Sequence, residues 1–486
     1  MLIGGGLRGS SDGTTINLIN PYDGTVSNVI PAATASDAND AVLAARGAFS
    51  AGTWSDISAA ARGRALLRLA ELVERDAAGL GALDTADNGK ILRETTKQAQ
   101  LSASTYRYYA GWADKNHGAV IPLESTDLLD YMTYEPYGVC VLLVAWNSPL
   151  QLLANKLAPA LAAGNTVVIK PSENASSSVL AMAPLFAEAG FPDGVVNIIT
   201  GSGGVSGDAL VRHPDVDLIS LTGGGATGRK ILQACSGRVV KVLLELGGKS
   251  PQIIFPDAPW EEAVNGVLAG IFAAAGQTCI AGSRVFVHES IFDAFVQDLQ
   301  TRASAIRLGD PMSSETDMGP LANRAHFDRV VSILERAMAA GASTAGGAGG
   351  PAPEIGALFV RPTILLNTDL SDEVVCEEVF GPVVVVHPFV TEEEVVKLSN
   401  DSSFGLAAGV WTSDLRRGLR MAKALEVGNV WVNTYRHLAP AAPFGGVKQS
   451  GNGRERGLEG LREYVRSKNV MISTKPRNDD PFTVRT

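Results

Sequence analysis

The sequence is poor in the residues that build metal sites and disulfide frameworks. It has 486 residues, of which four are cysteines and six are histidines. The cysteines are far apart and form no CxxC pair, and the histidines show no HxxxH or HExxH spacing, the arrangements typical of zinc sites. We therefore expect neither a structural metal nor a disulfide framework. The four cysteines are Cys140, Cys235, Cys279 and Cys376.

Excess positive charge and long apolar runs are also missing. The formal net charge is −10 and the pI is near 5.2. Nucleic-acid binders take much of their affinity from clustered Lys and Arg, so we expect no nucleic-acid partner. No stretch approaches the ~20 apolar residues of a membrane span, and residues 1–6 lack the basic and apolar regions of a signal peptide. The sequence predicts a cytoplasmic protein without a membrane partner.

The chain is long and apolar enough to form a large hydrophobic core. Hydrophobic residues make up 45% of the chain, and the length suggests roughly three parts of ~150 residues each. Residues 38–118 show helical spacing. A strand-like segment at 121–137 resembles an exposed hairpin, and residues 465–474 could form one more strand.

Between these segments, apolar strands alternate with helical patterns. This alternation predicts an α/β fold with a parallel sheet covered on both faces. A second α/β series runs from 251 to 433, and its Gly, Ala and Pro stretch at 342–353 is expected to be a surface loop. The strands of the first series are expected at 139–144, 166–169, 194–199, 218–221 and 239–244.

The glycine run Gly223–Gly228 fits the GxGxxG pattern of dinucleotide-binding folds. It follows the strand expected at 218–221 and precedes a helix expected at 229–234. Glycines there admit a pyrophosphate to the helix N-terminus. Glu245 lies about 20 residues further on, where such folds carry the acid that binds a ribose. A tight turn is the alternative interpretation of the glycines.

Glu245 has a second interpretation, as a general base that acts with Cys279. The two residues lie in the glycine-flanked segments ELGG and GQTC. A thiolate can add to a carbonyl, and a carboxylate can activate the water that cleaves the resulting thioester. Another acid is available for the ribose, because Lys170 and Glu173 follow the strand expected at 166–169. This favours a chemical role for Glu245, although a free cysteine is most often a buried structural thiol.

Six short segments are distributed over nearly the whole chain. They are AWNSP (145–149), KPSE (170–173), ELGG (245–248), GQTC (276–279), EEVFGP (377–382) and PFGGVKQSG (443–451). Together and in this order they resemble the aldehyde dehydrogenase superfamily. The resemblance implies its hydrolytic branch, because relatives that pass the acyl group to coenzyme A lack the base. It implies a Rossmann-type NAD-binding domain (1–117 and 138–247), an α/β catalytic domain (248–448) and a small β oligomerisation arm (118–137 and 465–486).

The resemblance also implies catalytic roles. Cys279 would be the nucleophile and Glu245 the base that activates the hydrolytic water. Asn147 would donate to the oxyanion together with the Cys279 backbone N–H. Preorganised donors of this kind commonly lower a barrier by ~3 kcal/mol or more. The expected reaction is the NAD-dependent oxidation of an aldehyde to a carboxylic acid, without a metal.

For the cofactor, the resemblance implies that Lys170 and Glu173 hold the adenosine ribose. Glu378 would hold the nicotinamide ribose, and Phe380 would support the nicotinamide ring. The Glu173 carboxylate would repel a 2′-phosphate, so we expect NAD to be preferred over NADP. The family often has Ser where Gly224 stands, which leaves backbone donors for the pyrophosphate. The remaining cofactor candidates are Trp146, Gly223, Gly224, Gly228 and Gly247.

Several of the positions that match the family's substrate funnel carry small or polar residues, where fatty-aldehyde oxidisers carry large aromatics. We expect a functionalised aldehyde, such as a semialdehyde or an aromatic or heterocyclic aldehyde. Arg436 could bind a substrate carboxylate, or face solvent or a neighbouring subunit. Phe444 could line the entrance or belong to the core. The substrate candidates are Ser148, Leu152, Asn155, Thr278, Ile280, Arg436 and Phe444.

The isolated strand segments at 121–137 and 465–474 would leave unpaired edges on a monomer, which pairing across subunits would cover. We therefore expect a homodimer or homotetramer, as in the family that the sequence resembles. Two other functions stay open. One is a conventional Rossmann dehydrogenase or reductase in which Glu245 binds ribose, and the other is a catalytically silent relative.

Overall fold

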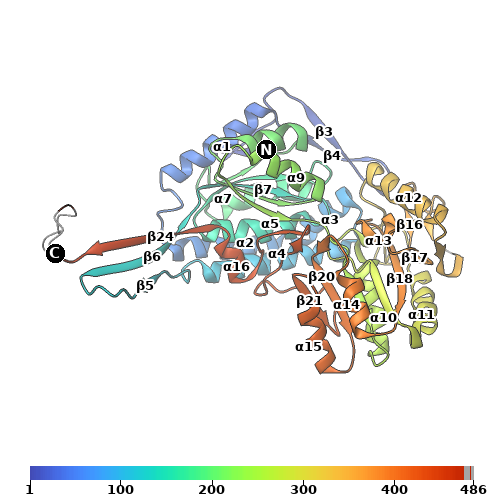
Figure 1. Cartoon of the computed structure of the whole chain (residues 1–486). Helices are drawn as coiled ribbons and strands as arrows, with labels where there is room; N and C mark the ends of the chain where they lie inside the picture. The colour runs from blue at the N-terminus through green and yellow to red at the C-terminus, as the bar shows by residue number, and fades with distance from the viewer. Residues whose placement is uncertain (348, 476–481, 483–486) are drawn as a thin grey trace.

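Two mainly parallel β-sheets and a three-stranded arm organise the chain in its computed structural model (Figure 1). The structure describes residues 1–347, 349–475 and 482. The α/β class expected from the sequence is confirmed. No helix among the described residues is long and apolar enough to cross a membrane.

The first sheet has the strand order β2-β1-β9-β8-β7-β10-β11-β23. Neighbouring strands from β9 to β11 are parallel. Of these, β7 comes first in the chain, and later strands are added on both of its sides, so the strand order reverses between β7 and β10. Ligands commonly bind at the carboxyl ends of strands beside such a reversal. The strands are β1 (Leu2–Ile3), β2 (Gly6–Leu7), β7 (Val139–Val144), β8 (Thr166–Pro171), β9 (Val196–Ile198), β10 (Leu218–Thr222), β11 (Lys241–Glu245) and β23 (Gly451–Asn452).

Helices cover both faces of this sheet, as alternate residues of β7 show. Cys140 and Leu142 pack into one hydrophobic cluster, whereas Val139 and Val141 pack into another. All four are fully buried, as expected for a parallel sheet covered on both sides. The helices are α1 (Ala35–Ser50), α2 (Ala59–Arg75), α3 (Ala77–Asn88), α4 (Leu92–Trp112), α5 (Pro149–Ala162), α6 (Ser177–Ala181), α7 (Ala183–Glu188), α8 (Asp208–Arg212), α9 (Gly225–Cys235) and α16 (Gly457–Arg462).

Local sequence explains how the helices begin. At α1, Thr34 and Asp37 form a capping box, in which each side chain accepts from the other's backbone N–H. Helix α5 begins at Pro149, a residue preorganised for the first helical position. Helix α9 begins at Gly225, four residues before the start expected at 229, so that boundary was wrong. Glycine's low helix propensity hides the true start.

The second sheet has the order β14-β17-β18-β13-β12-β20-β21, and β14 runs antiparallel to its neighbour. The segment 342–353, expected to be a surface loop, contains β14 and β15, so that prediction was wrong in part. Pairing with distant strands creates these elements, which local composition does not reveal. The strands of this sheet are β12 (Pro251–Ile254), β13 (Arg284–His288), β14 (Ser343–Thr344), β17 (Thr363–Leu366), β18 (Val383–Phe389), β20 (Ala407–Trp411) and β21 (Asn429–Val432). Strands β15 (Gly350–Pro351) and β16 (Val360–Arg361) form a separate antiparallel pair. The helices are α10 (Trp260–Ile271), α11 (Phe292–Ser304), α12 (Arg324–Ala339), α13 (Glu373–Cys376), α14 (Glu392–Asn400) and α15 (Leu415–Ala424).

An antiparallel arm projects from the body, with β6 between β24 and β5 (Figure 1). The expected hairpin at 121–137 and strand at 465–474 are thus confirmed. Residues 476–481 and 483–486 of the expected arm lie outside the described residues. The arm strands are β5 (Ala119–Ile121), β6 (Leu128–Pro136) and β24 (Val465–Ser473), and the remaining pairs are β3 (Thr15–Ile19) with β4 (Val26–Pro31) and β19 (Phe404–Gly405) with β22 (Val447–Lys448).

Candidate active site

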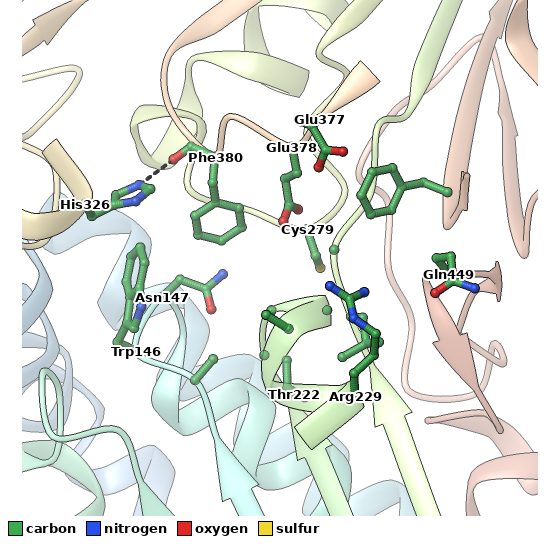
Figure 2. A pocket seen from close by; sticks show the side chains of 18 of the residues that line it. Trp146, Asn147, Thr222, Arg229, Cys279, His326, Glu377, Glu378, Phe380 and Gln449 are labelled. Carbon is green, nitrogen blue, oxygen red and sulfur yellow. Dashed lines mark hydrogen bonds between the residues drawn. The ribbon is translucent and has the colours of Figure 1, made fainter. Parts of the chain in front are cut away.

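Cys279 lies where two cavities meet. One, of about 490 Å³ and here called the central cavity, is lined by Trp146 and Phe380. The other, of about 730 Å³ and here called the Arg456 cavity, is lined by Glu245 and Arg456. Figure 2 shows the Cys279 side chain facing the central cavity. Two different molecules can therefore approach Cys279, one from each cavity. The residues that line both are Asn147, Leu152, Thr222, Leu246 and Cys279.

The backbone before Cys279 adopts a rarely populated conformation. Ala274 and Ala275 have φ of 56° and 52°, and Gly276 follows with φ of 71°. Non-glycine residues in this region cost ~1–3 kcal/mol each and persist where their surroundings hold them. A Cβ at Gly276 would lie 2.0 Å from Gly381 O. Contact with the EEVFGP segment therefore holds the loop that carries the thiol.

Two further glycines bring the ELGG segment against the same loop. A Cβ at Gly248 would lie 2.7 Å from Cys279 O, and one at Gly247 would lie 2.2 Å from Glu378 Oε2. Gly248 N also donates to Glu378 Oε1 at 3.0 Å. A side chain at either glycine would push these loops apart. Three segments that are distant in sequence thus meet around Cys279.

Asn147 follows β7 and reaches the Cys279 loop. Its Nδ2 donates to Gln277 O at 3.0 Å, and the amide carries a second N–H. Gln277 is itself anchored, because its Oε1 accepts from Ala322 N at 2.9 Å and its Nε2 donates to Ala274 O at 3.2 Å. These bonds preorganise an N–H donor next to the thiol loop, as an oxyanion site requires.

Glu245 ends β11 and lines the Arg456 cavity with Cys279. It is buried, and its Oε2 has no hydrogen-bond partner among the described residues. Burial and then the Glu455 carboxylate raise the pKa of Glu245 well above its ordinary value. A carboxylate with a raised pKa is a stronger base. Glu455 itself is bound by Lys156 Nζ at 2.6 Å and by Asn155 Nδ2 at 3.1 Å.

The Cys279 thiol is protonated in the resting site. Burial, followed by the carboxylates of Glu378 and Glu245, raises its pKa to about 12. Attack on a carbonyl needs the thiolate, so a base must assist. Lys90 also lines the Arg456 cavity, and burial lowers the pKa of its ammonium group to about 8.

A third cavity, of about 500 Å³ and here called the Lys170 cavity, continues from the central cavity past the start of α9. The two share Ala145–Trp146 and Thr222–Gly224. A Cβ at Gly224 would meet nothing within 4 Å, and Thr222 Oγ1 is buried without a hydrogen-bond partner among the described residues. The first N–H groups of a helix lack intrahelical partners and attract anions. Open space and unpaired donors at this helix start fit a pyrophosphate.

Gly228, expected to contact the cofactor, lines neither of these two cavities. A Cβ there would lie 3.0 Å from Leu246 Cδ2, so Gly228 permits α9 to pack closely against the end of β11. The glycine run also follows β10, whereas the first parallel strand, β7, leads to Trp146. The run therefore differs from an ordinary Rossmann fingerprint, which follows the first strand.

Lys170 and Glu173 line the Lys170 cavity together. Lys170 Nζ lies 3.7 Å from Glu173 Oε2 and donates to Pro171 O at 3.1 Å. Glu173 Oε1 accepts from Gly203 N at 3.3 Å, and its side chain is 38% exposed. The pair presents one ammonium group and one accessible carboxylate, which suit a ribose diol.

Trp146, His326 and Phe380 form an aromatic group on one side of the central cavity (Figure 2). The rings of Trp146 and Phe380 meet edge to face, with centroids 5.4 Å apart. His326 Nε2 lies 2.7 Å from Phe380 O, and burial lowers the pKa of this histidine to about 4.

Glu378 lies between Phe380 and Glu377 in Figure 2, close to Cys279, and burial raises its pKa to about 7. Gly247 also lines the central cavity.

All seven residues expected to contact substrate line the Arg456 cavity. Arg436 lines it while donating from Nη1 to Ala269 O at 2.7 Å. Phe444 lines it and also packs in a hydrophobic cluster with Ile280. Sequence reasoning missed six charged residues of the cavity, because no local pattern links their segments to Cys279. They are Lys90, Arg93, Glu94, Lys97, Glu455 and Arg456.

Known proteins share this sequence and architecture. Residues 8–470 match the aldehyde dehydrogenase family. The chain is 44% identical to (Z)-2-((N-methylformamido)methylene)-5-hydroxybutyrolactone dehydrogenase of Acinetobacter baylyi, over 96% of each sequence. It is 43% identical to betaine aldehyde dehydrogenase of Bacillus subtilis, over 95% of this chain and 94% of that protein.

Solved structures show the same similarity. Betaine aldehyde dehydrogenase of Staphylococcus aureus, in complex with NAD⁺, has a TM-score of 0.96 and 40% identity, over 99% of this chain and 96% of that chain. An NAD⁺ complex of aldehyde dehydrogenase from Bacillus cereus has a TM-score of 0.96 and 42% identity, over 98% of this chain and 96% of that chain. The chain therefore belongs to the aldehyde dehydrogenase family of oxidoreductases.

Proposed function

We propose that the protein oxidises an aldehyde to its carboxylic acid with NAD, through a covalent bond to Cys279. The observation that carries the proposal is the position of Cys279 between two cavities. The central cavity continues past the start of α9, and the Arg456 cavity contains Glu245. A dinucleotide on one side and an aldehyde on the other can thus reach the same sulfur. NAD⁺ in two solved relatives supports the choice of cofactor.

In the proposed mechanism, Cys279 loses its proton and its sulfur bonds to the aldehyde carbon. Asn147 and the Cys279 backbone N–H donate to the oxyanion of this hemithioacetal. The dinucleotide, when bound, supplies the hydride acceptor of the reaction, and oxidation leaves a thioester on Cys279. Glu245 then takes a proton from water as the oxygen attacks the thioester carbon. The sulfur leaves, and the carboxylic acid is released.

The residues that would hold the cofactor come from three segments. Lys170 and Glu173 would bind the adenosine ribose, and the Gly223–Gly224 backbone would bind the pyrophosphate. Glu378 would bind the nicotinamide ribose, with Phe380 beside the nicotinamide ring. Because the Glu173 carboxylate would repel a 2′-phosphate, NAD should be used in preference to NADP.

The substrate is proposed to be a functionalised aldehyde. Polar side chains, including Gln98, Gln151 and Asn155, line the Arg456 cavity, whereas long apolar aldehydes favour apolar walls. Betaine aldehyde, after which two of the relatives are named, is itself functionalised.

We also propose a homodimer or homotetramer assembled through the arm. Leu129 and Ile472 are cross-strand partners on the arm and are 44% and 45% exposed. An apolar surface on an exposed sheet supports assembly.

We further propose the domain bounds that the sequence predicts. These are an NAD-binding domain (1–117 and 138–247), a catalytic domain (248–448) and the oligomerisation segments (118–137 and 465–486). A cytoplasmic location is supported by the four cysteines, all of which are free thiols.

Two variants test the chemistry by the absorbance of reduced cofactor. Cys279→Ala should lose aldehyde oxidation by at least about 1,000-fold while still binding NAD, because the covalent step is gone. Glu245→Gln should release about one equivalent of reduced cofactor and then stall at the thioester. Cys376→Ser is the matched control, since this thiol is exposed. Wild-type turnover by either Cys279→Ala or Glu245→Gln would refute the mechanism.

A further inference from the structure

Arg456 is a buried arginine whose side chain has no ion-pair or hydrogen-bond partner among the described residues. The residue is 4% exposed, and its Nε is buried without a hydrogen-bond partner. No group among the described residues forms an ion pair with it or accepts a hydrogen bond from its guanidinium group. A guanidinium carries five N–H donors, and a buried charge usually has a counter-charge because desolvation is costly. The donors are therefore available to a ligand in the cavity that Arg456 lines.

The surrounding structure fixes the place of this side chain. The Arg456 Cζ lies 5.9 Å from the centroid of the Phe444 ring. Backbone hydrogen bonds of 2.7 Å in both directions join Phe444 to Glu455. Arg456 itself has φ of 61° before α16, a conformation that residues other than glycine rarely adopt. The guanidinium group is thus held against one wall of the cavity that also contains Cys279.

Four more cations line the same cavity, and two of them, Lys90 and Arg436, donate to neutral partners. Lys90 Nζ donates to Ser148 Oγ at 2.8 Å. Arg436 Nη1 donates to Ala269 O at 2.7 Å. Neither residue forms an ion pair with another described residue within 4.0 Å. Their charges therefore add to that of Arg456.

None of the three acids that line the cavity, Glu94, Glu245 and Glu455, forms an ion pair with Arg456 within 4.0 Å. Glu455 is already paired with Lys156, whose Nζ lies at 2.6 Å. Glu245 has a pKa raised by burial, which favours its neutral form. Glu94 lines the cavity and interacts with the Lys90 ammonium, but it forms no ion pair with Arg456.

On the basis of the proposed aldehyde oxidation, we propose that Arg456 binds a carboxylate of the substrate, so that the preferred substrates are aldehydes that also carry a carboxylate. Guanidinium and carboxylate groups match in shape and form paired hydrogen bonds. The cavity already holds Cys279 for the aldehyde end. A substrate of this class places its two ends on Cys279 and Arg456.

A cationic substrate fits this cavity poorly. Quaternary ammonium groups, such as that of betaine aldehyde, bind to the faces of aromatic rings. Among the described residues that line the Arg456 cavity, Phe444 is the one phenylalanine, and there is no tyrosine or tryptophan. Its ring already lies near the Arg456 guanidinium group. We therefore expect this protein to differ in substrate from the two betaine aldehyde dehydrogenases it resembles.

The test compares succinic semialdehyde, butanal and betaine aldehyde as substrates with NAD. Wild-type kcat/KM should be at least about tenfold higher for succinic semialdehyde than for butanal, and lowest for betaine aldehyde. In Arg456→Leu the ratio of kcat/KM for succinic semialdehyde to that for butanal should fall by about 10- to 100-fold, and less in Arg456→Lys, which keeps the charge. Arg462→Leu removes the same charge from an exposed position of α16 and should keep the wild-type ratio.

The outcomes separate this proposal from the one on which it rests. If no aldehyde reduces NAD, the proposed function fails. If butanal is oxidised but the ratio is near one, or changes equally in Arg456→Leu and Arg462→Leu, only the carboxylate site fails. If Arg456→Leu does not fold, inhibition of butanal oxidation by the wild-type protein tests the carboxylate site instead. Succinate should compete with butanal at least about tenfold better than butyramide does. Equal inhibition by the two would overturn the proposal.

Discussion

At the scale of single residues, the site depends on buried ionisable groups. Burial disfavours the charged form of each group. The pKa of Cys279 is raised to about 12, and that of Glu378 to about 7. Burial also raises the pKa of Glu245 and lowers that of Lys90 to about 8. Such shifts cluster at functional sites, because the same low dielectric that disfavours a resting charge strengthens interactions with a charged transition state.

These shifts predict that the rate increases with pH. Both the Cys279 thiol and the Glu245 carboxyl must lose a proton, and both pKa values are raised. Activity is therefore lost as the pH falls through these values. With butanal, kcat/KM should rise at least about tenfold from about pH 6.5 to about pH 9. A neutral aldehyde is the appropriate substrate, because Lys90 loses its charge above about pH 8.

Recovery of activity after return to neutral pH is the control for unfolding. A flat profile over this range would show that neither raised pKa governs the reaction.

The sequence identifies the chemically active residues, but it does not show which residues lie beside them in the fold. Cys279, Glu245 and Asn147 stand in short motifs, and their chemical identities limit what each can do. Their roles stay predictions, but the structure brings Cys279 and Glu245 into one cavity. Arg456 has no motif of its own. Its importance comes from being buried with no ion-pair or hydrogen-bond partner for its side chain among the described residues, and this depends on packing.

At the scale of elements, glycines decide how the loops meet. The sequence shows that glycines flank Glu245 and Cys279, but it cannot show which atoms approach them. Gly276 contacts Gly381, and Gly248 contacts the Cys279 carbonyl. Gly228 packs against the end of β11 and lines neither the central cavity nor the Lys170 cavity.

A substitution at Gly276 should therefore destabilise the loop that carries Cys279. In Gly276→Ala the new Cβ would lie 2.0 Å from Gly381 O, on a backbone with φ of 71°. We expect a loss of at least about 2 kcal/mol in stability, seen as a lower thermal midpoint, together with reduced activity. Gly237→Ala is the matched control, since nothing lies within 4 Å of its Cβ. Equal midpoints for the two variants would contradict the close-contact argument.

Strand order bears on the two interpretations of Glu245. In the order β8-β7-β10-β11, Glu173 follows β8 and Glu245 ends β11. The two acids therefore lie on opposite sides of the reversal between β7 and β10. This separation favours Glu173 for the ribose and Glu245 for the chemistry. No spacing in the sequence determines strand order, because only the tertiary fold decides which strands are neighbours.

At the scale of the whole molecule, the arm is the part whose apolar side chains stay exposed in a monomer. Its three strands project from the body (Figure 1). Several large apolar side chains on it are exposed, among them Val120 at 72% and Met471 at 53%. Exposed apolar strands usually mark contacts with other chains.

Removing this apolar surface should dissociate the proposed oligomer. Leu129→Lys combined with Ile472→Glu places opposite charges at a cross-strand pair, so the arm should stay folded. Sedimentation should then show a smaller species than the wild type at about 1 µM protein. Val239→Lys, at a fully exposed apolar residue outside the arm, is the control. An unchanged sedimentation coefficient in the double variant, or a monomeric wild type, would refute assembly through the arm.

The amino-acid sequence by itself determined the α/β class, the arm strands and the family, because hydrophobic periodicity and short motifs depend on residues that are near one another in the chain. It also identified a thiol and a carboxylate with glycines beside them. The tertiary structure decided that both line one cavity and that Glu173 and Glu245 lie apart. It also left the Arg456 side chain with no ion-pair or hydrogen-bond partner in the part of the chain that the structure describes. Each of these depends on contacts between distant segments, where packing sets burial and burial sets the state of each charge.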